Sequence, residues 1–180
     1  MLKITIPGGE YYDSKENRFY TVKEQTLSLE HSLVSISKWE SKWHKPFLVP
    51  DTKTIDETRD YIRCMTLTQN VDPKVYNMLT SENVRQVNEY MEDSMTASWV
   101  NEPKNAGRSR ETITSELIYY WMIALNVPME CQKWHLNRLL MLIRICNAKN
   151  QPPKQMSKSE IMRRNSQLNA ARRRAMHTKG

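Results

Sequence analysis

Met129–Cys146 reads M-E-C-Q-K-W-H-L-N-R-L-L-M-L-I-R-I-C and is the longest strongly apolar stretch of this 180-residue chain. Asn126, Val127 and Pro128 form a break before it, and proline is favoured at the first position of a helix. We therefore expect a long helix that begins at Pro128. A second apolar stretch, Glu111–Leu125, predicts the other half of an antiparallel helical hairpin. This hairpin is the predicted centre of the fold.

The first 30 residues carry strand patterns. Leu2–Ile6 alternates as L-K-I-T-I, and T-L-S-L-E-H alternates again from Thr26. Between them, two aromatic runs flank the polar segment D-S-K-E-N, which is typical of a hairpin. The pattern predicts a small antiparallel sheet of three or four strands, which is too thin to be stable alone and should pack on a helix.

Helix signals follow in series. Ser32–His44 has apolar residues at helical spacing, and Lys45-Pro46 ends it. Thr54 and Glu57 form a capping box for a helix that runs to about Thr66. Asp72-Pro73 and Ser81 each start a further helix. The predicted fold class is α+β and predominantly helical, with the N-terminal antiparallel sheet packed on a helical bundle.

The charge distribution divides the chain. Positions 1–153 hold 19 basic and 19 acidic residues, so the net charge of +7 belongs to the last 27 residues. Pro152-Pro153 ends the helical domain, because two prolines cannot continue a helix. Ser157 and Glu160 then form a capping box for a basic helix. We expect a sheet over 1–30, a helical domain over 31–150 in the same globule, and a basic helix or tail over 151–180.

Several classes of protein lack support in the sequence. The three cysteines include no C-x-x-C pair, which favours reduced structural thiols. There is no phosphate-binding loop and no G-x-S-x-G elbow. The N-terminus has no signal-peptide pattern, and charged residues interrupt the best apolar stretch, so no membrane span is expected.

The histidines are the best candidates for a catalytic or metal-binding site. Cys131 and His135 are four residues apart, on one face of the predicted helix, but zinc would need two further ligands with ligand spacing. His31 and His44 flank a helix without a second motif, so polar residues at helix ends are the favoured interpretation. We therefore assign no catalytic, metal-binding or cofactor-binding residue and expect no enzyme.

Contacts with a partner are the remaining candidates. Trp39 and Trp43 lie one turn apart on one face of their predicted helix. Tryptophan is favoured at interfaces, but burial in the core is the favoured interpretation and a partner contact is the alternative. The predicted C-terminal helix carries a second set of candidates, Arg163, Arg164, Arg172, Arg173 and Arg174. Their spacing spreads charge around the helix. Contact with an acidic protein surface is favoured over a solvated helix end. Nucleic acid is least favoured, because no aromatic residues are interleaved for base stacking.

Two long stretches carry a family resemblance. One is Leu27–Leu48, L-S-L-E-H-S-L-V-S-I-S-K-W-E-S-K-W-H-K-P-F-L. The other is Tyr119–Cys146, Y-Y-W-M-I-A-L-N-V-P-M-E-C-Q-K-W-H-L-N-R-L-L-M-L-I-R-I-C, which continues through N-Q-P-P-K-Q-M-S-K-S-E-I-M-R-R-N. They resemble proteins of the structural gene clusters of tailed bacteriophages, and the nearest category is the tail assembly chaperone.

The resemblance implies a non-enzymatic, mainly helical protein of the host cytoplasm. Such chaperones bind the tape measure protein and deliver it for polymerisation of the tail tube, so the tail tube protein is a second expected partner. A homo-oligomer and a place in the mature virion are left open. The alternatives are a minor virion structural protein, such as a head–tail connector or tail component, and a nucleic-acid-binding protein that uses the basic C-terminal segment.

Overall fold

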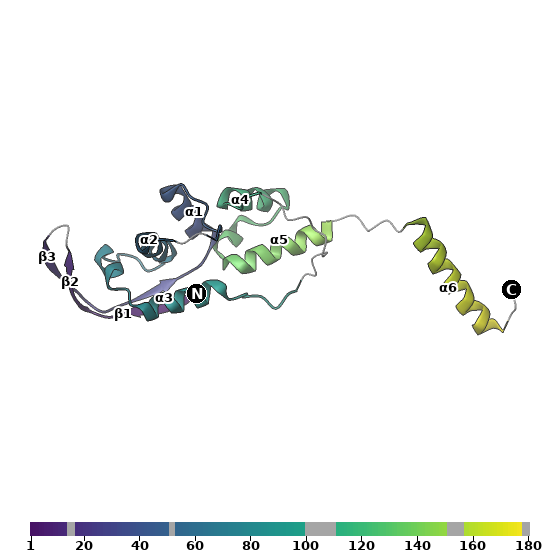
Figure 1. The fold of residues 1–180 in the computed structure, drawn as a ribbon, viewed down its shortest axis with the longest axis horizontal. Helices are drawn as coiled ribbons and strands as arrows, with labels where there is room; N and C mark the ends of the chain where they lie inside the picture. Colours follow the sequence, from purple (N-terminus) through teal and green to yellow (C-terminus); the bar gives the residue numbers. More distant parts are fainter. Residues whose placement is uncertain (14–16, 51–52, 100–110, 151–156, 178–180) are drawn as a thin grey trace. The chain divides into compact units, whose positions relative to one another are not determined.

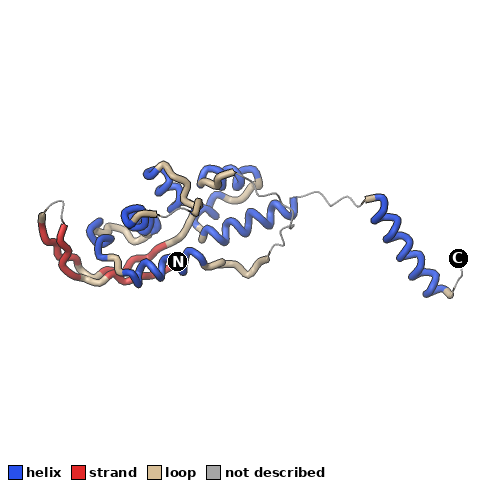
Figure 2. Tube along the Cα trace, in the orientation of Figure 1, coloured by secondary structure: helices blue, strands red, loops and turns tan. Residues whose placement is uncertain are grey.

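The computed structural model describes residues 1–13, 17–50, 53–99, 111–150 and 157–177. The chain divides into two compact units, Met1–Ala148 and Lys149–Gly180, which are treated separately below. The first unit, here called the body, combines an N-terminal β-hairpin with helices, and the second contains a single described helix (Figures 1 and 2). The fold is α+β and predominantly helical, which confirms the predicted class.

The N-terminal strands form one long hairpin. β1 (Leu2–Ile6) pairs with β4 (Gln25–Leu29), and β2 (Gly9–Asp13) pairs with β3 (Arg18–Val22), all antiparallel. The register is continuous, because Ile6 faces Gln25 and Gly9 faces Val22 with two residues between these pairs on either side. The prediction of one sheet with three or four strands is therefore wrong: each ladder has two strands.

Gly8 lies at the junction of the two ladders. A Cβ atom there would lie 2.8 Å from the backbone nitrogen of Glu24 and 3.1 Å from the carbonyl oxygen of Val22. Real side chains do not tolerate the first of these distances, so glycine lets the two arms of the hairpin stay close where their pairing is interrupted.

The β1–β4 ladder is amphipathic, as its alternating sequence requires. Ile4 and Ile6 of β1 and Leu27 and Leu29 of β4 are buried, while the intervening side chains face outward or lie at the edge. Helix α3 (Ser81–Glu92) packs against β1. A thin ladder thus buries its apolar face on helices, as expected.

The first two helices lie close to the bounds that the sequence predicts. α1 (Leu33–Trp43) begins after Ser32, whose side chain accepts from the backbone N–H of Ser35, and it ends at His44 in the left-handed region. α2 (Ile55–Met65) begins with the predicted capping box between Thr54 and Glu57. Each box satisfies N–H groups that the helix itself cannot pair.

Two further elements also start where the sequence indicates. The 3₁₀ helix η1 (Pro73–Met78) has Asp72 as its N-cap and proline at its first position. α3 begins at Ser81, with Thr80 as the capping residue. The capping of α3 ties it to the hairpin, because Asn83 also donates through Nδ2 to the carbonyl oxygen of Thr5 at 3.1 Å.

The apolar stretch Met129–Cys146 is not one helix. A short 3₁₀ helix, η2 (Met129–Lys133), is followed by extended backbone at Trp134, and α5 (Leu136–Asn150) begins only afterwards. His135 forms a β-bridge with Ser32, and the N–H of Leu136 donates to the carbonyl oxygen of His31 at 2.7 Å. Pairing with the segment that follows the hairpin therefore holds the backbone extended at a point where the local sequence pattern favours a helix.

The helix before this stretch also differs from prediction. α4 (Ser115–Ala124) begins after the N-cap Thr114, several residues later than Glu111. It buries Ile118 and Met122, whereas Tyr120 is 63% exposed. α4 packs on α1, and α1 also contacts α2 and η2. α1 thus contacts three of these elements, and the second half of the predicted helical hairpin is divided between η2 and α5.

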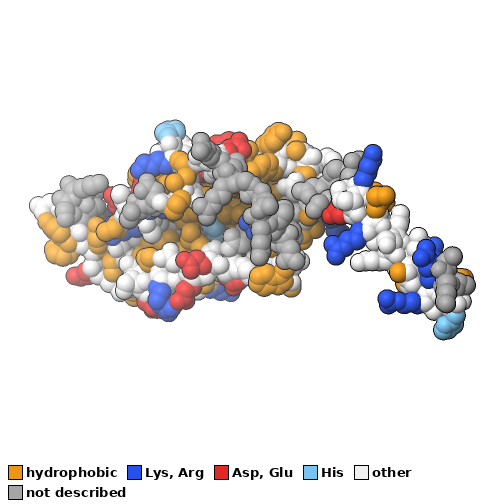
Figure 3. Space-filling model, turned by 45° about the vertical axis from the view of Figure 1, so that its right-hand side comes forward, with side chains coloured by type: hydrophobic (Ala, Val, Ile, Leu, Met, Phe, Trp, Pro, Cys, Tyr) orange, Lys and Arg blue, Asp and Glu red, His pale blue; other side chains and the backbone are white. Residues whose placement is uncertain are grey.

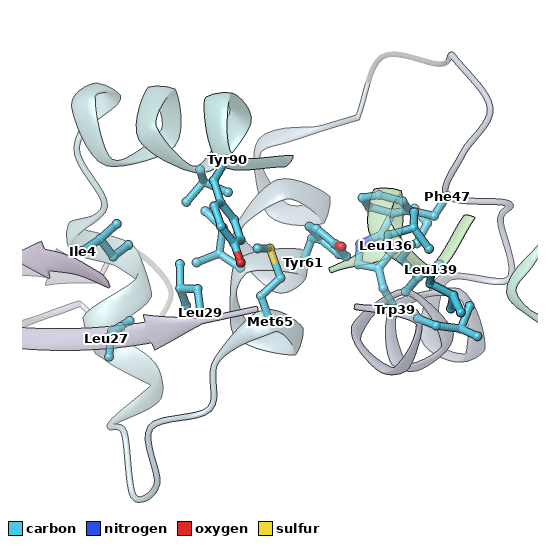
Figure 4. Close-up of a cluster of buried hydrophobic side chains, with 14 of the residues drawn as sticks. Ile4, Leu27, Leu29, Trp39, Phe47, Tyr61, Met65, Tyr90, Leu136 and Leu139 are labelled. Atoms are coloured by element: carbon cyan, nitrogen blue, oxygen red, sulfur yellow. The ribbon is translucent and has the colours of Figure 1, made fainter. Parts of the chain in front are cut away.

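The core of the body is a continuous cluster (Figure 4). At one end Ile4, Leu27 and Leu29 of the hairpin pack near Met65 of α2. At the other end lie aromatic and aliphatic side chains of α1, α5 and the segment after α1, namely Trp39, Phe47, Leu136 and Leu139. The hairpin and the helices therefore share one core, and hydrophobic burial links their stabilities.

Candidate functional site

The helix of the second unit, α6 (Lys158–Met176), is the main candidate. Ser157 and Glu160 form the predicted capping box, and His177 ends the helix in the left-handed region. None of its residues is buried. Most helix stability in proteins comes from the packing of one apolar face. α6 is thus a helix whose side chains are exposed on every side.

α6 carries both charge and exposed apolar groups. The helix holds six basic residues and one acidic residue, Glu160. Blue basic side chains and orange apolar side chains both stand on its surface (Figure 3). The large apolar side chains that are exposed are Ile161, Met162, Leu168 and Met176.

The apolar groups on α6 follow a narrow stripe. Ile161, Leu168 and Ala175 are seven residues apart, and this spacing brings them to one side of a helix. Ile161 is 44% exposed and Leu168 is 47% exposed. Arg164 and Arg172 lie beside the stripe at 100° per residue. This pattern suits contact with another helix that offers apolar residues flanked by carboxylates.

The remaining arginines lie elsewhere on α6. Arg163, Arg173 and Arg174 project from other sides of the helix, at 100° per residue. The structure therefore bears out a helix with charge on several sides. It brings the five predicted arginines together on one element.

The two predicted tryptophans are placed differently from each other. Trp39 is 1% exposed, and its Nε1 donates to the carbonyl oxygen of Glu57 at 2.9 Å. Trp43 is half-buried, stacks on Trp39, and donates to Asp60 at 2.9 Å. Trp39 therefore belongs to the core and joins α1 to α2, and only Trp43 reaches the surface.

The histidines form a buried structural centre. The rings of His31 and His135 lie 5.2 Å apart. His31 Nδ1 is 2.5 Å from the hydroxyl oxygen of Tyr61, and His135 Nε2 donates to the carbonyl oxygen of Tyr90 at 3.0 Å. Burial lowers the pKa of His31 to about 3, with a further contribution from His135, and burial also lowers the pKa of His135. Both rings join separate elements of the core.

Cys131 and His135 do not lie on one face of a helix as predicted, because the extended backbone at Trp134 separates the two residues. Burial raises the pKa of the thiols of Cys64 and Cys131, which lowers their reactivity. Within the described ranges, no group of three or more His, Cys, Asp and Glu side chains gathers as metal ligands.

A hollow of about 270 Å³ lies between α2 and α3. Its walls are mainly apolar, and Lys53 is the charged residue that lines it. Neither His135 nor His44 is among its lining residues. The hollow therefore does not join a histidine to a carboxylate, which acid–base chemistry would need.

Sequence reasoning missed one surface. Tyr120 and Ile123 of α4 are 63% and 67% exposed, although most residues of their helix are apolar. The available signal was that apolar residues stand on more than one side of the helix, so the sequence indicates no single buried face. Apolar side chains gather along the upper edge of the body in Figure 3, where α4 lies.

Comparison with protein-family models, with curated proteins and with solved structures finds no match to this chain. In the parts of the chain that the structure describes, no helix has the length and apolar character needed to cross a membrane.

Proposed function

We propose that this protein is a bacteriophage tail assembly chaperone that binds the tape measure protein during tail morphogenesis. The single observation that carries the proposal is α6, a capped helix whose apolar stripe and arginines are all exposed. The family resemblance rests on the amino-acid sequences of Leu27–Leu48 and Tyr119–Cys146.

The proposed contact is helix against helix. A tape measure protein is long and helical, so an amphipathic α6 would lay Ile161 and Leu168 against an apolar stripe of the client. Arg164 and Arg172 would pair with carboxylates beside that stripe. Such a contact needs no catalytic group. Because α6 has little apolar surface of its own, the contact would be weak enough for release when the tube forms.

Co-expression with the tape measure protein tests this function. The full chain should co-purify with the client, and truncation after Asn150 should abolish the complex. Leu168→Glu should weaken it by about tenfold or more, because it places a charge in the apolar stripe. Lys3→Glu, on an exposed position of β1, is the control and should leave binding unchanged.

The chaperone function would be overturned by two results together: the protein does not co-purify with the tape measure protein, and it is found in finished virions. These results would favour a minor virion structural protein.

A nucleic-acid-binding function is the second candidate, and the arginines on several sides of α6 favour it. It predicts a DNA or RNA mobility shift that weakens steeply with salt and vanishes on truncation after Asn150. Charge reversal at Arg172, Arg173 and Arg174 should then abolish the shift, whereas Leu168→Glu should leave most of it. The two functions thus respond differently to the same pair of variants.

A further inference from the structure

Within the part of the chain that the structure describes, the outer face of α4 exposes large apolar side chains. Ile118 and Met122 bury the inner face, while Tyr120 is 63% exposed and Ile123 is 67% exposed on the outer side. Apart from Glu116, which also lies on the outer side, the residues of α4 are mainly apolar, and an apolar helix face is ordinarily covered. α4 therefore has a face that a second molecule would cover.

The residues of this outer face follow a definite order. Glu116, Tyr120 and Ile123 are separated by four and three positions, which places them along one side of the helix. Ile113 stands just before the N-cap and is 40% exposed. Along the chain the order is an apolar residue, a carboxylate, a phenol and an apolar residue. A carboxylate accepts hydrogen bonds and a phenol donates one. When two such helices lie antiparallel, the carboxylate of each therefore faces the phenol of the other.

We propose that the body forms a two-fold dimer in which α4 packs antiparallel against α4 of a second copy. In this arrangement Tyr120 of one copy donates to Glu116 of the other, and the symmetry repeats the bond. Ile123 of each copy then packs near Ile113 of the other. An isologous interface requires this self-complementarity, because every contact occurs twice.

The charge of the body permits a second copy as the occupant. Positions 1–153 hold equal numbers of acidic and basic residues, so two bodies approach without net repulsion. Antiparallel packing also places the N-terminus of one helix dipole beside the C-terminus of the other. A parallel arrangement would instead set Glu116 against Glu116. The dimer is independent of the proposed client and does not involve α6.

Molar mass measured by light scattering over a concentration range tests the proposal on the full chain. The wild type should approach twice the chain mass of 21.3 kDa as concentration rises. Ile123→Glu should raise the dimer dissociation constant by about tenfold or more, because each copy then adds a further carboxylate to an interface that already contains Glu116 of both copies. Ile55→Glu is the matched control, since Ile55 is 71% exposed on α2, and its dimer should be unchanged.

Tyr120→Phe is the milder variant, because it keeps the ring and removes only the hydroxyl donor. It should weaken the dimer less than Ile123→Glu does. A wild type that stays at the monomer mass throughout overturns the proposal. So does an unchanged dimer in Ile123→Glu, provided that the variant keeps the wild-type circular dichroism spectrum.

Cysteine cross-linking tests the antiparallel direction. Chains with Ile113→Cys and chains with Ile123→Cys should form a disulfide with each other when mixed, located by peptide mapping to exclude the native cysteines. Cross-links of position 113 with position 113 would contradict the arrangement. Loss of client binding in Ile123→Glu while the wild type remains monomeric would assign this face to the client and overturn the dimer.

Discussion

The buried carboxylate of Glu40 accepts a hydrogen bond from the backbone N–H of Ser115, 75 residues later in the chain, at a distance of 2.8 Å. Its other oxygen accepts from the backbone N–H of Phe47 at 2.7 Å. Ser115 is the first residue of α4, where helix N–H groups lack internal partners and the helix dipole favours an anion. One side chain of α1 thus fixes the start of α4 and the segment after α1.

Glu40→Gln should therefore destabilise the body. The amide keeps one acceptor oxygen but sets an NH₂ group against one of the two backbone N–H donors, which leaves that donor unsatisfied in the core. The expected loss is about 2–3 kcal/mol of unfolding free energy. Urea denaturation followed by tryptophan fluorescence measures it. Glu89→Gln, on the exposed face of α3, is the control. Equal midpoints for the two variants would contradict the role of Glu40.

The His31–His135 pair predicts a pH dependence of stability. Burial lowers the pKa of both imidazoles, and that of His31 falls from an ordinary 6.5 to about 3 because of burial and its neighbour His135. Below pH 6.5 the unfolded chain therefore binds more protons than the folded one. Stability should be full above that pH and should fall as the pH drops toward 3, at up to about 1.4 kcal/mol per pH unit for each proton.

Unfolding free energy measured from pH 7.5 to pH 4.5 checks this dependence. His31→Asn should lower stability at neutral pH but flatten the slope by about one proton. His44→Asn is the matched control, because His44 is an exposed, left-handed C-cap, a position that asparagine tolerates. A slope that persists in His31→Asn would show that the dependence arises elsewhere.

Trp39 and Trp43 should differ in their effect on stability. Trp39→Ala removes a fully buried ring that bonds to Glu57 and packs against Phe47, and it should cost about 3–5 kcal/mol. Trp43→Ala removes a half-buried ring and should cost markedly less. Thermal and urea unfolding of both variants would reveal the order. The reverse order would contradict the placement of Trp39 in the core.

The capping box of α6 predicts a local effect. Ser157→Ala removes the side chain that accepts from the backbone N–H of Glu160 at 3.2 Å, which should cost the helix about 1 kcal/mol. Amide hydrogen exchange in α6 should accelerate by about fivefold, while exchange in α1 stays unchanged. Ser166→Ala, in the middle of the helix, should slow exchange or leave it unaltered. Acceleration in both variants would show that the cap is not responsible.

Local signals predicted much of this fold. Thr54 with Glu57, Asp72 with Pro73, and Ser157 with Glu160 each mark a helix start that the structure confirms, because capping depends on residues within one turn. The alternation in Leu2–Ile6 likewise identified its buried face. The boundary between the neutral and the basic part of the chain was also predictable, since the positions of charged residues are given by the sequence.

Predictions failed where distant residues compete with local preference. The sequence by itself determined the helix caps, the strand faces and the basic character of α6. Only the tertiary structure decided that His135 pairs with Ser32 and interrupts the longest apolar stretch. It also decided that Glu40 sets the start of α4. In both cases a long-range hydrogen bond satisfies backbone groups inside the core, and the cost of leaving them unpaired exceeds the small free energies that local helix propensity provides.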